Sequence, residues 1–148
     1  MFSVKFVKNQ ILTISSACVD LLGHRMPVES NNVLGKAFDF AVRVVRLHQY
    51  LVKEHKEFVL SKQLLRSGTS IGANINEAQA GQSKADFISK MSIASKESRE
   101  AKYWLDLLCT TGYLDNTESH VRSLLNQSEE LIKLLTSIVK AAQRNTKH

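Results

Sequence analysis

The sequence has 148 residues and a mass of 16.6 kDa, the size of one domain that can bury a core without disulfides or bound metals. Hydrophobic residues make up 43% and charged residues 23%, with one proline and six glycines, a composition that favours long uninterrupted helices. The two cysteines, Cys18 and Cys109, lie far apart and form no C-x-x-C pair. Neither a disulfide framework nor a zinc site is predicted, and a reducing cytoplasm is the expected location.

Basic residues exceed acidic ones, with 20 Lys and Arg against 14 Asp and Glu, for a net charge of +6. This excess favours polyanionic partners such as RNA or DNA, and it is spread along the chain rather than gathered in a tail. No apolar run reaches the roughly 18 residues that a membrane helix needs, so we expect no membrane span.

The first 25 residues differ in character from the rest, because their short apolar runs form no sustained helical stripe. Asp20 interrupts these runs and no convincing cleavage site follows, which argues against a signal peptide. We therefore expect residues 1–25 to be a poorly ordered extension or an over-extended start, and residues 26–148 to form the folded domain.

The first helix is expected from Asn32 to about His55-Lys56. Its apolar residues step by four and three along two adjacent seams: Val33, Ala37, Phe40, Val44, Leu47 and Leu51, and beside them Leu34, Phe38, Ala41, Val45, His48 and Val52. A helix within one bundle needs an apolar stripe of roughly 100°. The doubled seam therefore predicts contact with another subunit.

The second helix is expected to begin at Phe58-Val59-Leu60, with Ser61 near its first turn, and to end at Gly81. A close-packed seam is predicted at Leu64, Gly68, Ile71, Ile75 and Ala78. A glycine inside a helix costs roughly 1 kcal/mol relative to alanine, so Gly68 and Gly72 predict close approach by a neighbouring helix. A polar face follows Arg66, Ser70, Asn74 and Glu77. We interpret it mainly as a layer that fixes helix register and, as an alternative, as a ligand-binding groove.

Ser83, with Asp86 three residues later, is expected to cap a third helix that ends at Gly112. Thr117 with Glu118 is expected to open the last helix. The seams of these two helices are Phe87, Met91, Ala94, Ser98, Ala101, Leu105 and Leu108, and then Leu124, Ser128, Leu131, Leu135, Ile138 and Ala142. Four long amphipathic helices with short connections predict an all-α, antiparallel up-down-up-down four-helix bundle.

The sequence contains no recognisable catalytic or metal-binding pattern. Glu77, Glu97 and Glu100 suggest a di-iron site, but none of the five histidines follows a glutamate by three residues, as ferritin-like sites require. No G-x-S-x-G, P-loop or H-E-x-x-H occurs. His48 and Cys109 are interpreted as core residues. We expect no enzymatic activity, no catalytic residue, no metal and no cofactor.

The candidate nucleic-acid-binding residues lie on the first helix, in the turn after it and near the end of the chain: Arg43, Arg46, Lys53, Lys56, Lys62, Lys140 and Arg144. Single cations are commonplace on solvated surfaces. A ring of copies would multiply phosphate contacts, and binding strength grows with their number. The alternative is a protein-interaction scaffold whose charge only aids solubility.

A family resemblance rests on Ser70-Ile71-Gly72-Ala73-Asn74-Ile75-Asn76-Glu77-Ala78, followed by Lys84-Ala85-Asp86-Phe87, Ile93-Ala94 and Tyr103-Trp104-Leu105. From about Leu34 to Val139 the chain resembles the four-helix-bundle proteins related to the 23S rRNA intervening-sequence protein. Many members carry glycine after the motif glutamate, whereas Ala78 follows Glu77 here.

The resemblance implies a bacterial cytoplasmic protein that assembles as a homopentameric ring and has no established enzymatic activity. Some relatives are accessory proteins of diversity-generating retroelements, in which a basic ring binds nucleic acid and a reverse transcriptase. A reverse transcriptase is therefore a candidate partner by resemblance.

Overall fold

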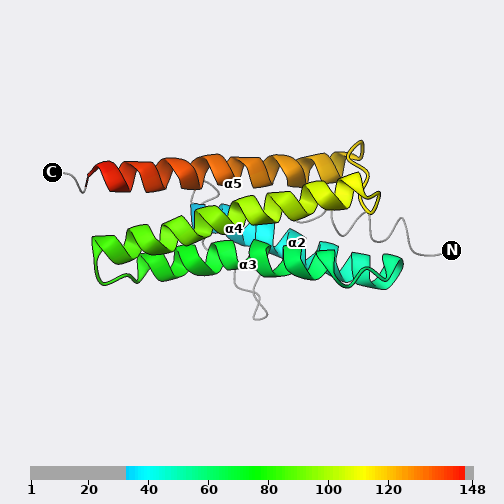
Figure 1. The fold of residues 1–148 in the computed structure, drawn as a ribbon, viewed down its shortest axis with the longest axis horizontal. Helices are drawn as coiled ribbons and strands as arrows, with labels where there is room; N and C mark the ends of the chain where they lie inside the picture. Colours follow the sequence, from blue (N-terminus) through cyan, green and yellow to red (C-terminus); the bar gives the residue numbers. More distant parts are fainter. Residues whose placement is uncertain (1–32, 146–148) are drawn as a thin grey trace, which may run out of the picture.

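The computed structural model describes residues 33–145, and these form four α-helices and no strand. The helices are α2 (Val33–His55), α3 (Leu60–Gln79), α4 (Lys84–Thr110) and α5 (Ser119–Arg144). Figure 1 shows them side by side, with the α2–α3 and α4–α5 connections at one end and the α3–α4 connection at the other. The predicted all-α four-helix bundle is confirmed. The extension predicted at residues 1–25 lies outside the described residues.

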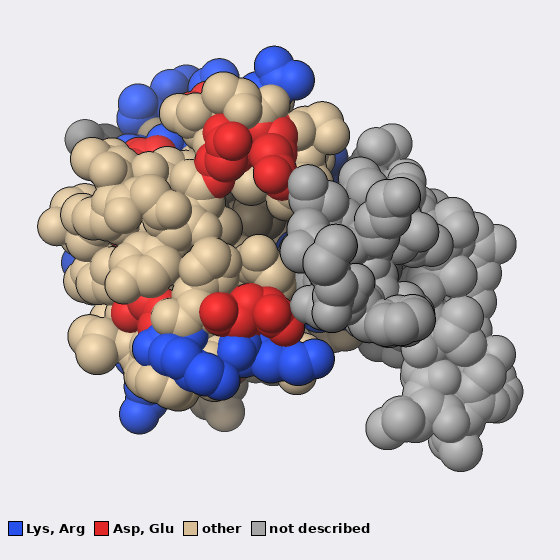
Figure 2. Space-filling model, turned by 90° about the vertical axis from the view of Figure 1, so that its right-hand side faces the viewer, with Lys and Arg blue, Asp and Glu red and all other residues tan. Residues whose placement is uncertain are grey.

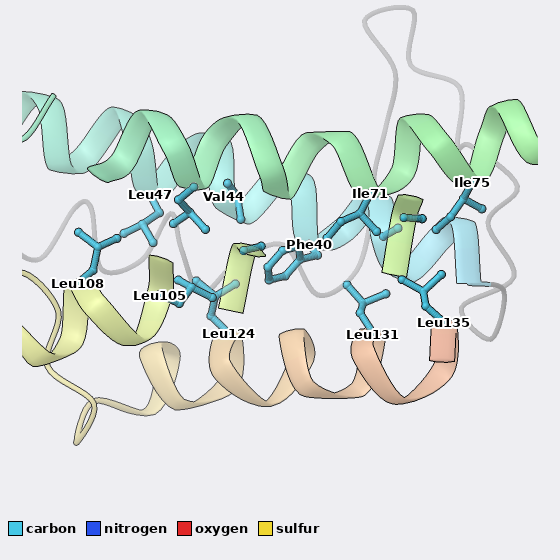
Figure 3. Close-up of a cluster of buried hydrophobic side chains, with 14 of the residues drawn as sticks. Phe40, Val44, Leu47, Ile71, Ile75, Leu105, Leu108, Leu124, Leu131 and Leu135 are labelled. Carbon is cyan, nitrogen blue, oxygen red and sulfur yellow. The ribbon is translucent and has the colours of Figure 1, made fainter. Parts of the chain in front are cut away.

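Every helix contributes to one hydrophobic core. On α2, the seam from Ala37 to Leu51 is buried, whereas the second seam stays partly exposed and Phe38 keeps 42% of its surface open. Figure 3 shows core side chains from all four helices directed toward one another: Phe40, Val44, Leu47, Ile71, Ile75, Leu105, Leu108, Leu124, Leu131 and Leu135. The predicted seams are therefore largely the core, although Phe87, Ile138 and Ala142 at their ends are only partly buried.

Contacts between neighbouring helices pair early residues of one with late residues of the other. On α2 and α5, Lys36 lies 2.7 Å from Glu130, whereas Arg43, two turns later, lies 2.9 Å from the earlier Gln127. The same reversed order, in which an early residue of one helix meets a late residue of the other, appears in the other two contacts. Between α3 and α4 the pairs are Arg66 with Glu100 and Glu77 with Lys90. At the α4–α5 contact they are Lys84 with Asn145 and Arg99 with Thr136.

The close approach predicted for α3 occurs at Gly68. A Cβ atom added to Gly68 would lie 3.0 Å from Cγ1 of Val44, whereas one added to Gly72 would lie 3.7 Å from the Cβ of Ala37, an ordinary contact. Val44 is fully buried and β-branched, so its side chain has little freedom to move aside. Of these two glycines, only Gly68 is required by packing.

The predicted cap of α4 is confirmed. Ser83 precedes the helix in an extended conformation, and its hydroxyl accepts a hydrogen bond from the backbone N–H of Asp86 at 3.1 Å. Beyond the end of α4, Gly112 has a φ of 83°, the left-handed conformation that glycine adopts without strain. These two residues fix where α4 begins and ends.

α5 begins at Ser119, directly after the predicted opening residues Thr117 and Glu118. The N-cap residue is Glu118, and no side chain caps the helix. Thr117 lies one residue earlier, and its hydroxyl donates to the carboxylate of Asp115 at 2.6 Å. The hydroxyl stabilises the turn instead of the helix, because aspartate accepts readily from groups two residues ahead.

The cap of α3 comes from Glu57, a buried carboxylate that the sequence analysis did not single out. Glu57 accepts hydrogen bonds from the backbone N–H groups of Val59, Leu60 and Ser61 at 3.0, 2.8 and 2.7 Å. Desolvation raises the pKa of Glu57, but these bonds and one from the Ser61 side chain outweigh it, so the net pKa lies below its usual value. The ionised carboxylate is therefore part of the helix start.

Replacing Gly68 by alanine is expected to lower the free energy of unfolding by about 1 kcal/mol or more, because crowding against Val44 outweighs the better helix propensity. Gly72→Ala is the matched control and should raise stability by up to about 1 kcal/mol. Urea unfolding followed by circular dichroism measures both. Equal stabilisation by the two substitutions would contradict the close approach.

Glu57→Gln is expected to cost about 1 kcal/mol near pH 7, the usual contribution of a helix cap. Because the folded-state pKa is depressed, the stabilising effect of Glu57 is complete above its ordinary pKa of about 4.5 and is lost as the pH falls through the folded-state value. The difference in unfolding free energy between wild type and variant should therefore shrink below about pH 4.5. A pH series of urea unfolding curves tests this, with Glu54→Gln as an exposed control; a constant difference down to pH 3 would disprove it.

Candidate nucleic-acid interface

Arg43, one of the predicted phosphate contacts, is directed toward α5. Its guanidinium donates to the carbonyl of His120 and to the side chains of Gln127 and Ser123, at 2.9, 2.9 and 3.2 Å. Burial lowers the pKa of Arg43. The forked guanidinium thus ties α2 to α5, and we do not include it in a nucleic-acid surface.

Lys53, Lys56 and Lys62 are exposed where α2 joins α3. Lys53 lies 3.8 Å from Glu54, and the ammonium of Lys56 donates to the carbonyl of Lys53 at 3.0 Å. Figure 2 faces this end of the bundle and shows Lys and Arg in separate groups at the upper and lower edges, with acidic groups beside them. Neighbouring carboxylates weaken the attraction of these cations for a polyanion. Arg46 lies partly buried on α2.

A line of cations follows one side of α5: Arg122, Lys133, Lys140 and Arg144, named here the α5 basic line. All four are exposed, and none of their side chains has a hydrogen-bond or ion-pair partner within residues 33–145. Their intervals of 11, 7 and 4 residues return to nearly the same side of a helix with 3.6 residues per turn. At 1.5 Å per residue the line is about 33 Å long.

Two further cations on α4 flank this line. Arg99 donates to the hydroxyl of Thr136 at 2.9 Å, and the ammonium of Lys102 lies 3.9 Å from Glu129, the acidic residue within the line. Lys102 also bonds Asp106. Glu130, the neighbour of Glu129, is bonded to Lys36 on the α2 side. The acidic residues near the line are thus at least partly compensated by cations of other helices.

The sequence prediction included Lys140 and Arg144 but missed Arg122 and Lys133. Their common spacing along one helix was the available signal. Lys140 and Arg144 lie at the end of the bundle opposite the α2–α3 connection, so the structure separates them from Lys53, Lys56 and Lys62 (Figure 1). The predicted cations therefore do not form one patch.

The predicted polar face of α3 lies along the contact with α4. Arg66 forms an ion pair with Glu100, and Glu77 forms one with Lys90 at 2.5 Å. Between them, the amide of Asn74 donates to the carbonyl and hydroxyl oxygens of Ser70 at 2.9 and 3.0 Å. Two ion pairs at different positions along α3 and α4 are what a layer that fixes the register of these two helices would contain.

The two residues interpreted as core residues are partly buried. His48 Nδ1 lies 2.9 Å from the hydroxyl of Ser61, and burial raises the pKa of the Cys109 thiol. Within residues 33–145, no three side chains of His, Cys, Asp or Glu gather where they could hold a metal ion. Among the described helices, none is both long and apolar enough to cross a membrane.

Comparison with known proteins identifies a family and a similar solved structure. The model of the 23S rRNA-intervening sequence protein family matches residues 29–137. A crystal structure of a protein of unknown function from the S23 ribosomal protein family of Bacteroides thetaiotaomicron is 55% identical in sequence. It aligns with a TM-score of 0.70 over 74% of this chain and 99% of that chain. No match was found among curated proteins.

Proposed function

The chain belongs to the 23S rRNA-intervening sequence protein family, and from this premise we propose that it is a non-enzymatic, oligomeric helical bundle that binds RNA or DNA through the α5 basic line. Its cysteine usage and the family resemblance favour a cytoplasmic location. The observation that carries the proposal is the set of four exposed cations on one side of α5 without partners within residues 33–145.

Phosphate binding is the chemistry that such a line supports. Each Lys or Arg that meets a phosphate releases condensed counterions, so several cations in a row bind a polyanion with an affinity that falls steeply with salt. These contacts go to the backbone and carry no sequence information. The proposal is therefore for binding that depends on charge rather than on base sequence.

Self-association is the second part of the proposal, and the surface of α2 supports it. Beyond its buried seam, α2 carries a second apolar seam that the other helices leave partly open, including Phe38 at 42% exposure. A helix that is apolar over most of its circumference is normally covered on more than one side. A stable monomer at micromolar concentration in sedimentation experiments would contradict this part.

We also infer that the four helices follow an antiparallel up-down-up-down course. The crossed order of the contacts between neighbouring helices and the alternating ends of the three connections (Figure 1) support this arrangement. In this arrangement α5 runs along the bundle, and the α5 basic line extends over nearly the full length of one edge.

Lys133→Gln combined with Lys140→Gln is expected to weaken binding to an unstructured single-stranded RNA and to flatten its salt dependence. Each lost phosphate contact should reduce the slope of log affinity against log salt by about 0.7, so the pair should reduce it by about 1.4. Fluorescence anisotropy over a range of salt concentrations measures the slope.

The matched control is Lys53→Gln combined with Lys90→Gln, which removes the same charge from two lysines that lie near Glu54 and Glu77, away from the α5 basic line. The control should bind almost as the wild type does. Absence of binding at low salt, or binding that salt does not weaken, would contradict the polyanion proposal. Equal effects of the two double variants would contradict the role of the α5 basic line.

The alternative function is a protein-interaction scaffold or an accessory subunit, for example of a reverse transcriptase, with no direct contact to nucleic acid. Two large apolar residues at the α2–α3 connection favour it, since Phe58 is 56% and Val59 68% exposed. Exposed apolar surface of this kind suits a protein partner. The salt series separates the two functions, because a scaffold would show no RNA binding to weaken.

A further inference from the structure

Tyr103 is a large aromatic residue on the outward side of α4. It is 59% exposed, and its hydroxyl has no hydrogen-bond partner within residues 33–145. Lys96 and Arg99 precede it by seven and four residues, so the three side chains share one side of the helix. Both cations are exposed as well. An exposed aromatic ring beside two cations suits the bases and the phosphates of a nucleic acid.

The ring of Tyr103 is supported by its neighbour Trp104. The two rings pack edge to face, with their centroids 5.0 Å apart. Trp104 is itself partly buried against the core, and its indole N–H donates at 3.2 Å to Glu100, which also pairs with Arg66. Tyrosine has only two side-chain torsions, so a ring supported in this way loses little conformational entropy when a ligand stacks on it.

Arg99 connects this side of α4 to the α5 basic line. Its guanidinium donates to the hydroxyl of Thr136 on α5 at 2.9 Å. Thr136 lies three residues after Lys133 and four before Lys140, so both lysines are its neighbours on the surface of α5. The ring of Tyr103 and the cations of the α5 basic line therefore belong to one surface, which α4 and α5 form together.

The acidic residues beside the ring are engaged by a cation of the chain. Asp106, three residues after Tyr103 on α4, is bonded to Lys102, whose ammonium also lies 3.9 Å from Glu129 of α5. Lys96, in contrast, has no ion-pair or hydrogen-bond partner for its side chain among the described residues. The surface around the ring thus retains positive charge that a phosphate can meet.

We propose that Tyr103 stacks on a base of a single-stranded nucleic acid whose phosphates lie along the α5 basic line. This rests on the polyanion binding proposed above and names the form of nucleic acid that the surface selects. Cations alone attract duplexes and single strands alike, whereas stacking on an aromatic side chain requires an unpaired base. Every base has a face that can stack, so the selection is for strandedness and not for sequence.

Tyr103→Ala tests this proposal in the full chain. It should weaken binding of the unstructured single-stranded RNA about fivefold or more, the effect of losing one stacked base. The slope of log affinity against log salt should stay unchanged, because no phosphate contact is lost. Binding of a duplex RNA of the same length should also stay unchanged. Fluorescence anisotropy measures all three quantities.

Two control variants accompany it. Tyr103→Phe keeps the ring and should bind the single strand as the wild type does. Phe58→Ala removes a similarly exposed aromatic residue, 56% open, at the α2–α3 connection, and it should also bind as the wild type does. Sedimentation velocity should show the same state of association for Tyr103→Ala and wild type.

Several outcomes would overturn the stacking role of Tyr103. They are an equal loss of single-strand and duplex binding in Tyr103→Ala, a loss in Tyr103→Phe as large as in Tyr103→Ala, and altered self-association, which would place Tyr103 at a contact between copies. Salt-dependent RNA binding that Tyr103→Ala leaves unchanged would overturn the stacking role alone. Absence of RNA binding by the wild type would overturn it together with the proposed function.

Discussion

The contact of Gly68 with Val44 determines how closely α2 and α3 approach each other, and both helices supply residues to the shared core. Because glycine has no Cβ, the fully buried Val44 reaches the backbone of α3. That approach brings the large core residues of the two helices, Phe40 and Ile71, to the same interior (Figure 3). A bulkier residue at position 68 would separate the helices or strain Val44.

Polar contacts join α5 to α2 in addition to the shared core. Arg43 donates to three acceptors on α5, and Lys36 is bonded to Glu130. Both cations are thus directed at α5, where Lys36 meets a carboxylate and Arg43 meets three neutral acceptors. The outward side of α5 retains Arg122, Lys133, Lys140 and Arg144, which have no such partners among the described residues. The cations that join α2 to α5 are thus separate from the cations on the outward side of α5. The proposed function uses the second set.

The proposed assembly and the proposed polyanion binding use different surfaces. The α5 basic line consists of cations that would gain from phosphates, whereas self-association would use the second apolar seam of α2. Copies of a chain with net charge +6 repel one another. Apolar surface such as Phe38 on α2 would supply a driving force for association that does not depend on charge.

Local chemistry was enough to determine the four helices, their seams and the cap at Ser83, because helical periodicity and capping act over a few residues. The seam containing Leu64 and Gly68 was identified in this way and is buried. Only the tertiary structure decided which charged groups are compensated, since ion pairs between helices depend on how each helix is rotated and where it is placed along its neighbour. For that reason Arg43 was predicted as a phosphate contact although it binds α5, while the role of Glu57 at the start of α3 emerged only from the folded chain.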